Sequence, residues 1–132
     1  MSDAPMAPRA IVAGHGDFAA GLVSAVQLIT GRGGVFVAVS NTGLSGADIE
    51  SMMRRTVTDH GIRVVFTDLQ AGSCTMAARK VLRGVEDHVL VVGVSLPMLI
   101  DFVFADRLPP ADAARHAFER GRTGMSIMGG TP

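Results

Sequence analysis

Short runs of apolar residues alternate with helix-like segments along the chain, and this alternation limits the possible folds more than any other feature of the sequence. The apolar runs span residues 10–13, 35–39, 62–66 and 88–94. Apart from Arg63, His88 and Gly93, the residues of these runs are apolar and do not alternate with polar ones, which is typical of parallel strands that are buried on both faces. We therefore predict an α/β fold: a doubly wound, mostly parallel sheet with helices on both faces.

The first two segments between these runs have apolar residues at helical spacing and recognisable ends. A helix is predicted to begin at about Phe18 and to stop at Gly31. Ser45 with Asp48 three residues later has the pattern of a capping box. A second helix is therefore predicted after Ser45, and Gly61 closes it.

The later segments follow the same plan. Ser73 is expected to cap a third helix, which Gly84 ends. Pro97 suits the first position of a fourth helix, because a residue there needs no backbone N–H. Residues 109–110 are both proline and open a last helix, predicted over about 111–120.

Length and charge set the broad class of protein. A chain of 132 residues that is 48% hydrophobic is long enough for one core, so we predict a flexible lead over residues 1–8 and a single domain over 9–132. Basic and acidic residues number 12 each, and this balance provides no field that attracts nucleic acid or an anionic membrane.

The hydropathy pattern predicts a location. The opening residues lack the apolar core of a signal peptide, and the longest apolar region, 88–105, is interrupted by polar residues and a proline. We expect a soluble, cytoplasmic protein. Its single cysteine, Cys74, cannot form an internal disulfide or a cysteine metal cluster, so we expect it to be a small apolar side chain that is buried or half-buried.

The turns that follow the predicted strands contain the candidate functional residues. His15 lies between Gly14 and Gly16 after the first strand, and Asp68 follows the third strand. Ligands of doubly wound sheets bind beyond the carboxyl ends of the strands. A histidine at that edge can act as a nucleophile through one ring nitrogen while a carboxylate accepts a hydrogen bond from the other. The residues alone leave open an anion site, an acid–base pair, or a purely structural role.

The sequence resembles the enzyme IIA domains of the mannose-type sugar phosphotransferase system. The resemblance lies in three blocks, VAGHGDFAAGLVSAVQLITG, VVFTDLQAGSCTMAARKV and VVGVSLPMLIDFVF, and extends from about Arg9 to about Met128. Its most specific parts are the HG-x-[FL]-A-x-G pattern after the first strand and the TDL-x-x-G-[ST] pattern after the third.

The resemblance implies a role for each matching residue. His15 would be phosphorylated, Asp68 would hold its ring, Gly16, Gly72 and Ser73 would bind the phosphoryl group, and Ser95 and Pro97 would form a wall of the site. The donor would be phospho-HPr and the acceptor a histidine of enzyme IIB, with no metal or diffusible cofactor. Dimers of this family exchange a C-terminal strand, to which residues 123–128 correspond.

The match to the family pattern is incomplete in two turns. The chain reads Ala71-Gly72-Ser73-Cys74 where the family usually has GG-[ST]-P, and it has Ser95-Leu96 where the family usually has Asn and a small or branched residue.

Three functions are alternatives to a phosphoryl relay: a binding module regulated by phosphorylation, the phosphoryl donor subunit of a dihydroxyacetone kinase, and a small hydrolase. A hydrolase of this fold would be expected to have a G-x-S-x-G elbow, which the chain lacks.

Overall fold

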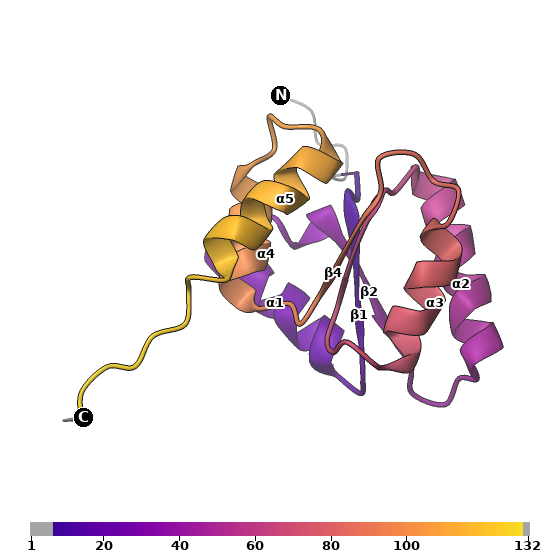
Figure 1. Ribbon diagram of the computed structural model, residues 1–132, viewed down its shortest axis with the longest axis horizontal. Coiled ribbons are helices and arrows are strands. Elements are labelled where there is room, and N and C mark those ends of the chain that lie inside the picture. The colour runs from indigo at the N-terminus through magenta and orange to yellow at the C-terminus, as the bar shows by residue number, and fades with distance from the viewer. Residues whose placement is uncertain (1–6, 131–132) are drawn as a thin grey trace.

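The computed structural model describes residues 7–130 and has one parallel sheet at its centre (Figure 1). The strand order is β2-β1-β3-β4, and every neighbouring pair is parallel. The strands are β1 (Ala10–Gly14), β2 (Phe36–Ser40), β3 (Val64–Thr67) and β4 (Val89–Val92). The predicted α/β class with a parallel sheet is confirmed.

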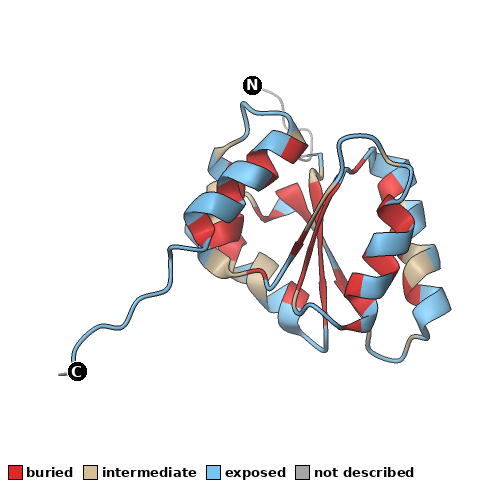
Figure 2. Ribbon diagram, viewed as in Figure 1, coloured by how far each residue is buried: buried red, intermediate tan, exposed pale blue. Residues whose placement is uncertain are grey.

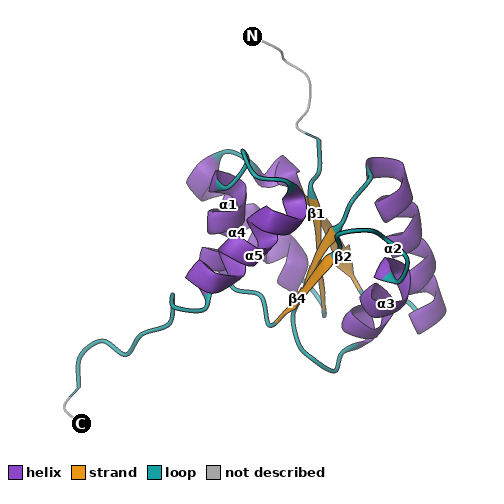
Figure 3. Cartoon of the chain, turned by 45° about the horizontal axis from the view of Figure 1, so that its top comes forward, coloured by secondary structure: helices purple, strands orange, loops and turns teal. Residues whose placement is uncertain are grey.

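Helices cover both faces of the sheet, as predicted (Figure 3). The helices are α1 (Phe18–Thr30), α2 (Gly46–His60), α3 (Ser73–Leu82), α4 (Leu96–Phe104) and α5 (Pro110–Gly121), with a short 3-10 turn η1 (Gly33–Val35) before β2. Side chains of a strand alternate between its two faces. Ala10 and Val12 of β1 therefore pack in the core beneath α1, α4 and α5, while Ile11 and Ala13 pack beneath α2 and α3.

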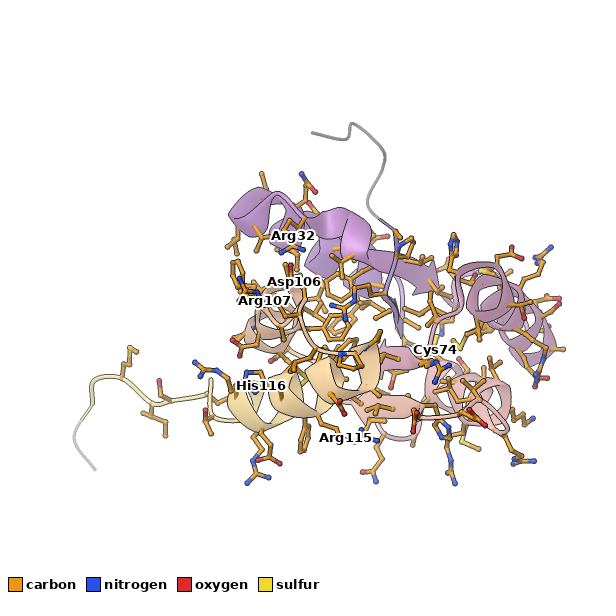
Figure 4. All side chains as sticks on the ribbon, turned by 90° about the horizontal axis from the view of Figure 1, so that it is seen from above. Arg32, Cys74, Asp106, Arg107, Arg115 and His116 are labelled. Atoms are coloured by element: carbon orange, nitrogen blue, oxygen red, sulfur yellow. The ribbon has the colours of Figure 1, made fainter. Side chains whose placement is uncertain are left out.

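Both layers of core are closed to solvent. Figure 2 shows buried residues along the strands and on the inward faces of the helices. Phe36, Phe66 and Phe102 pack together on the α4 side, with ring centroids 5.3 to 6.2 Å apart. At the edge of that layer Arg32 donates to the carboxylate of Asp106 at 3.0 Å (Figure 4), which joins the end of α1 to the segment after α4.

The predicted ends of the elements are largely confirmed. Ser45 and Asp48 form a complete capping box at the start of α2, and Gly61 ends that helix in a left-handed conformation. Strand β4 stops at Val92, two residues short of the predicted end, because Gly93 has a φ of +75° and leaves the extended region. The amides of Gly93 and Val94 then donate to the carbonyl of Thr67 instead.

Two predicted helix starts are wrong by one residue. Ser73 does not cap α3: the N-cap is Gly72, and Ser73 already has helical backbone. Its hydroxyl instead accepts a hydrogen bond from Asn41 Nδ2 at 3.4 Å. In α4, Ser95 is the N-cap and accepts from the amide of Met98, so Pro97 is the second helical residue rather than the first. Proline is tolerated there because first-turn amides have no partner within the helix.

The C-terminal segment extends away from the domain (Figure 1). Within the described chain, residues 125–128 have no regular secondary structure, and Ile127 is 98% exposed. The strand expected at residues 123–128 is absent from the single chain, and the exchange between two chains stays a prediction.

The predicted lead over residues 1–8 falls mostly outside the described residues. None of the helices among residues 7–130 is long and apolar enough to cross a membrane.

Candidate functional site

The topology brings His15 and Asp68 together, although they are 53 residues apart in sequence. His15 follows the carboxyl end of β1, and Asp68 follows that of β3. Strands β1 and β3 are parallel neighbours in which Ala13 is aligned with Thr67. Strand β2 lies on one side of β1 and β3 lies on the other, so the order of the strands reverses at β1. His15 and Asp68 therefore lie at the switch point of the sheet, where doubly wound folds bind ligands.

Three hydrogen bonds hold the Asp68 carboxylate. Its Oδ2 accepts from the backbone amide of His15 at 2.9 Å and lies 2.6 Å from His15 Nδ1. Its Oδ1 accepts from the amide of Leu69 at 2.9 Å. An ionised carboxylate can only accept, so the hydrogen of the neutral imidazole resides on Nδ1 and leaves Nε2 with a free lone pair.

Burial differs sharply between the two partners. The side chain of Asp68 is 7% exposed and that of His15 is 53% exposed. Burial by itself raises the pKa of Asp68, but the hydrogen bonds from the His15 ring, the His15 amide and the Leu69 amide together outweigh burial and lower that pKa. Asp68 is therefore a charged, oriented acceptor at neutral pH, while the ring of His15 faces solvent.

Two glycines allow this close approach. A Cβ on Gly14 would lie 2.8 Å from Phe18 Cδ1 and 3.0 Å from the Asp68 carboxyl carbon. A Cβ on Gly72 would lie 3.1 Å from His15 Cε1. A side chain at Gly14 would therefore displace Phe18 or the Asp68 carboxylate, and one at Gly72 would press on the His15 ring. Gly16 serves a different need, since its φ of +55° is a left-handed conformation that suits glycine.

The turn after β2 contributes residues that the sequence analysis missed. The amide of Asn41 donates to the carbonyl of Gly14, and its side chain donates to Ser73 Oγ. Ser40 Oγ donates to the carbonyl of Gly16 at 2.8 Å. Ser40 and Asn41 follow the predicted strand 35–39, just as His15 and Asp68 follow theirs. Their position after a strand could therefore have identified them as candidate site residues.

The remaining predicted site residues divide into two groups. Gly72 lies against the His15 ring, Gly16 follows His15 in the chain and accepts a hydrogen bond from Ser40, and Ser73 follows Gly72 and accepts one from Asn41. Ser95 and Pro97 start helix α4 beyond β4, and no hydrogen bond among residues 7–130 joins them to His15 or Asp68. The structure thus puts them at the same edge of the sheet without making them part of the histidine–aspartate cluster.

Cys74, labelled in Figure 4, belongs to the first turn of α3 and is fully buried. Its Sγ is 3.9 Å from the carbonyl oxygen of Gly14. Burial, followed by the nearby charge of Asp68, raises the pKa of this thiol, so it stays protonated. Among residues 7–130, no group of three or more His, Cys, Asp or Glu side chains is placed to hold a metal ion.

Fold and site together define a class of protein: a doubly wound α/β domain that presents a solvent-facing imidazole oriented by a buried carboxylate. A family model described as the PTS system fructose IIA component, EIIA-man, matches residues 9–118. The chain belongs to this family of phosphotransferase-system IIA proteins, as its sequence motifs indicated. Members of the family are phosphotransferases that act in sugar uptake.

Solved structures agree with this assignment. The phosphotransferase component EIIA from Streptococcus agalactiae is 25% identical with a TM-score of 0.79, over 90% of this chain and 95% of that one. The mannose/sorbose specific IIA subunit from Enterococcus faecalis, 18% identical, has the same fold with a TM-score of 0.79 over 96% of this chain and 98% of that one. No curated protein sequence matches the chain.

Proposed function

We propose that this protein relays a phosphoryl group during sugar uptake. It accepts the group from phospho-HPr on His15 and passes it to a histidine of enzyme IIB. The observation that carries the proposal is the 2.6 Å contact between His15 Nδ1 and Asp68 Oδ2 on a ring that is half exposed. One ring nitrogen is thereby held as a hydrogen-bond donor, and the other is available to a partner protein.

The transfer uses the free lone pair of Nε2. As Nε2 bonds to phosphorus, the bond between phosphorus and the donor imidazole breaks, and the electron pair of that bond stays on the donor nitrogen. The hydrogen on Nδ1 remains hydrogen-bonded to Asp68 Oδ2, and the carboxylate stabilises the positive charge that develops on the ring. The second transfer reverses these steps towards the acceptor histidine of enzyme IIB.

The start of helix α3 is suited to hold the transferred group. A Cβ on Gly72 would lie 3.1 Å from His15 Cε1, the ring carbon bonded to both nitrogens, so a group on Nε2 is close to the first turn of α3. No side chain caps that turn, and its amides remain available. Amides at a helix N-terminus favour phosphate. Gly16, Gly72 and Ser73 are therefore the proposed phosphoryl-binding residues, with Ser95 and Pro97 as a more distant wall.

The proposed partners are proteins, and the proposed location is the cytoplasm. The half-exposed ring of His15 lies in an open turn, which lets donor and acceptor approach in succession.

The protein is proposed to form a homodimer in which residues 123–128 of each chain add an antiparallel strand to the sheet of the other chain. In support, β4 is an edge strand of the sheet, and a groove of about 380 Å³ runs beside it, lined by Val89, Leu90, Val91, Val92, Arg115, Phe118 and Glu119.

Intact-mass measurement tests the relay directly. The wild type is incubated with enzyme I, HPr and phosphoenolpyruvate, and we expect a gain of one phosphoryl group that is lost in acid. The variant His15→Ala should gain none. His116→Ala, a change at an exposed histidine of α5, is the matched control and should behave as wild type. Absence of phosphorylation in the wild type, or equal phosphorylation in His15→Ala, would overturn the proposal.

A further inference from the structure

Two buried hydroxyl groups lie directly beneath Asp68. Thr67 and Thr75 are 0% and 2% exposed, and they are the only buried residues with polar side chains in the part of the chain that the structure describes. Buried polar groups are costly unless they are hydrogen-bonded. Thr67 is the last residue of β3, and Thr75 belongs to the first turn of α3. The pair therefore connects the two elements between which Asp68 is held.

Counting hydrogens gives the direction of these bonds. Thr75 Oγ1 lies 2.6 Å from Thr67 Oγ1 and 2.5 Å from the carbonyl oxygen of Leu69. The carbonyl can only accept, and a threonine hydroxyl has one hydrogen to donate. Thr75 therefore donates to the carbonyl of Leu69 and accepts from the hydroxyl of Thr67. This is the arrangement in which both short contacts are hydrogen bonds.

The hydroxyl of Thr75 thus joins the residues on either side of Asp68. On one side, Thr67 is also held by the turn after β4, because its carbonyl accepts from the amides of Gly93 and Val94. On the other side, Leu69 is held at its carbonyl by Thr75 and donates its own amide to Asp68 Oδ1. The carboxylate consequently has little freedom to turn away from His15.

We propose that Thr75 is a positioning residue for phosphoryl transfer at His15. Its hydroxyl holds the turn that aims the Asp68 carboxylate, and the carboxylate in turn keeps the hydrogen of the His15 ring on Nδ1. The hydrogen bonds of the Thr75 hydroxyl go to Thr67 and Leu69, and none among residues 7–130 joins it to the His15 ring. The inference deepens the proposed relay and rests on it for its effect on rate, but its effect on the ring can be measured without any transfer.

Thr75→Val tests the role of the hydroxyl, because valine has nearly the same shape and lacks only the polar atom. Nitrogen NMR of the His15 ring at a pH where the imidazole is neutral measures which nitrogen bears the hydrogen. In the wild type we expect the Nδ1–H form, and in Thr75→Val a mixture with the Nε2–H form. Phosphorylation by phospho-HPr should slow by roughly tenfold to a hundredfold, the effect of a misplaced catalytic group.

Two further variants separate the positioning role from a loss of stability. Thr75→Ser keeps the hydroxyl and should restore both the Nδ1–H form and the rate. Thr56→Val is the matched control, since Thr56 Oγ1 also donates to a carbonyl, that of Met52 within α2, away from the site. It should leave the ring and the rate unchanged. Thr75→Ala, which adds no bulk, provides the same NMR measurement if Thr75→Val does not fold.

The outcomes decide between the proposals. A ring in Thr75→Val or Thr75→Ala that keeps the wild-type Nδ1–H form, with the wild-type rate, overturns the positioning role. Slow transfer with an unchanged ring also overturns it, since the hydroxyl would then act in another way. If the wild type itself accepts no phosphoryl group, the relay fails, while the NMR comparison still decides whether Thr75 orients the site.

Discussion

The Asp68 carboxylate orients His15 and also stabilises the folded chain. Its pKa is lowered in the folded protein because the hydrogen bonds from His15 and Leu69 outweigh the effect of burial. A group that ionises more readily in the folded state adds stability at pH values above its unfolded pKa, which for aspartate is about 3.9. That contribution is lost as the pH falls through the lowered folded-state pKa.

We therefore predict a pH-dependent difference in stability between the wild type and Asp68→Asn. The free energy of unfolding should be higher for the wild type near neutral pH, and the difference should shrink as the pH falls below about 4. Urea denaturation at a series of pH values measures it. Asp59→Asn removes an exposed carboxylate of α2 and should show a small difference throughout. A difference for Asp68→Asn that did not change with pH would contradict the assignment.

Gly72 provides a second test, because its role is spatial and not conformational. Its φ of −83° is open to any residue, but an added Cβ would press on His15 Cε1 at 3.1 Å. We expect Gly72→Ala to fold normally and to slow phosphorylation by roughly tenfold, since small displacements of reacting groups are costly.

The control for this change is Gly61→Ala. Gly61 has a φ of +63° and nothing within 4 Å of an added Cβ, and it ends α2 away from the site, so this substitution strains the backbone without touching the site. It should lower the free energy of unfolding by about 1 kcal/mol and leave the phosphorylation rate unchanged. Equal rates for the two variants would show that Gly72 does not control the position of the ring.

Helices α2 and α3 begin with serines whose roles differ despite similar sequence context. Ser45 caps α2, and its side chain accepts from the amide of Asp48 at 3.1 Å. Ser73 is the first residue of α3 and caps nothing. Ser45→Ala should therefore lower the free energy of unfolding by about 1 kcal/mol, the usual value for a lost N-cap.

Ser73→Ala should have a much smaller effect on stability, because it removes only a long hydrogen bond from Asn41. Thermal or urea unfolding of the two variants measures the difference. Ser73→Ala should instead slow phosphorylation, because the Ser73 hydroxyl is proposed to contact the transferred phosphoryl group. A loss of stability from Ser73→Ala as large as that from Ser45→Ala would mean that the serine caps α3 after all.

The whole molecule has an unpaired sheet edge and an exposed tail, which together suggest how two copies associate. β4 is an edge strand, and Met125, Ile127 and Met128 of the tail are 88%, 98% and 90% exposed. Exposed edge strands and apolar side chains are both suited to pairing with another chain. The proposed dimer satisfies both features with one added strand.

Ile127→Asp tests this arrangement by placing a charge on the exchanged strand. We expect the wild type to sediment as a dimer and Ile127→Asp to dissociate into monomers at concentrations where the wild type does not. Leu28→Asp introduces the same charge at a residue of α1 that is 85% exposed, and it should leave the dimer intact. A wild type that is monomeric, or an unaffected Ile127→Asp dimer, would contradict strand exchange.

Much of the site could be anticipated because its residues stand directly after apolar runs. His15 and Asp68 were placed correctly by the rule that strand ends meet at one edge, and Asn41 obeys the same rule although it was overlooked. The cap assigned to Ser73 was wrong by one residue, because an isolated serine at a helix start does not reveal whether its backbone is already helical.

The amino-acid sequence by itself determined the alternation of strands and helices, the capping box of α2 and the residue types at the site. These features depend on neighbours within a few positions, where periodicity and capping act. Only the tertiary structure decided the strand order β2-β1-β3-β4 and the contact between His15 and Asp68. It also decided the burial of Thr75 beneath them. These depend on how residues far apart in the chain pack, and no local pattern encodes that packing.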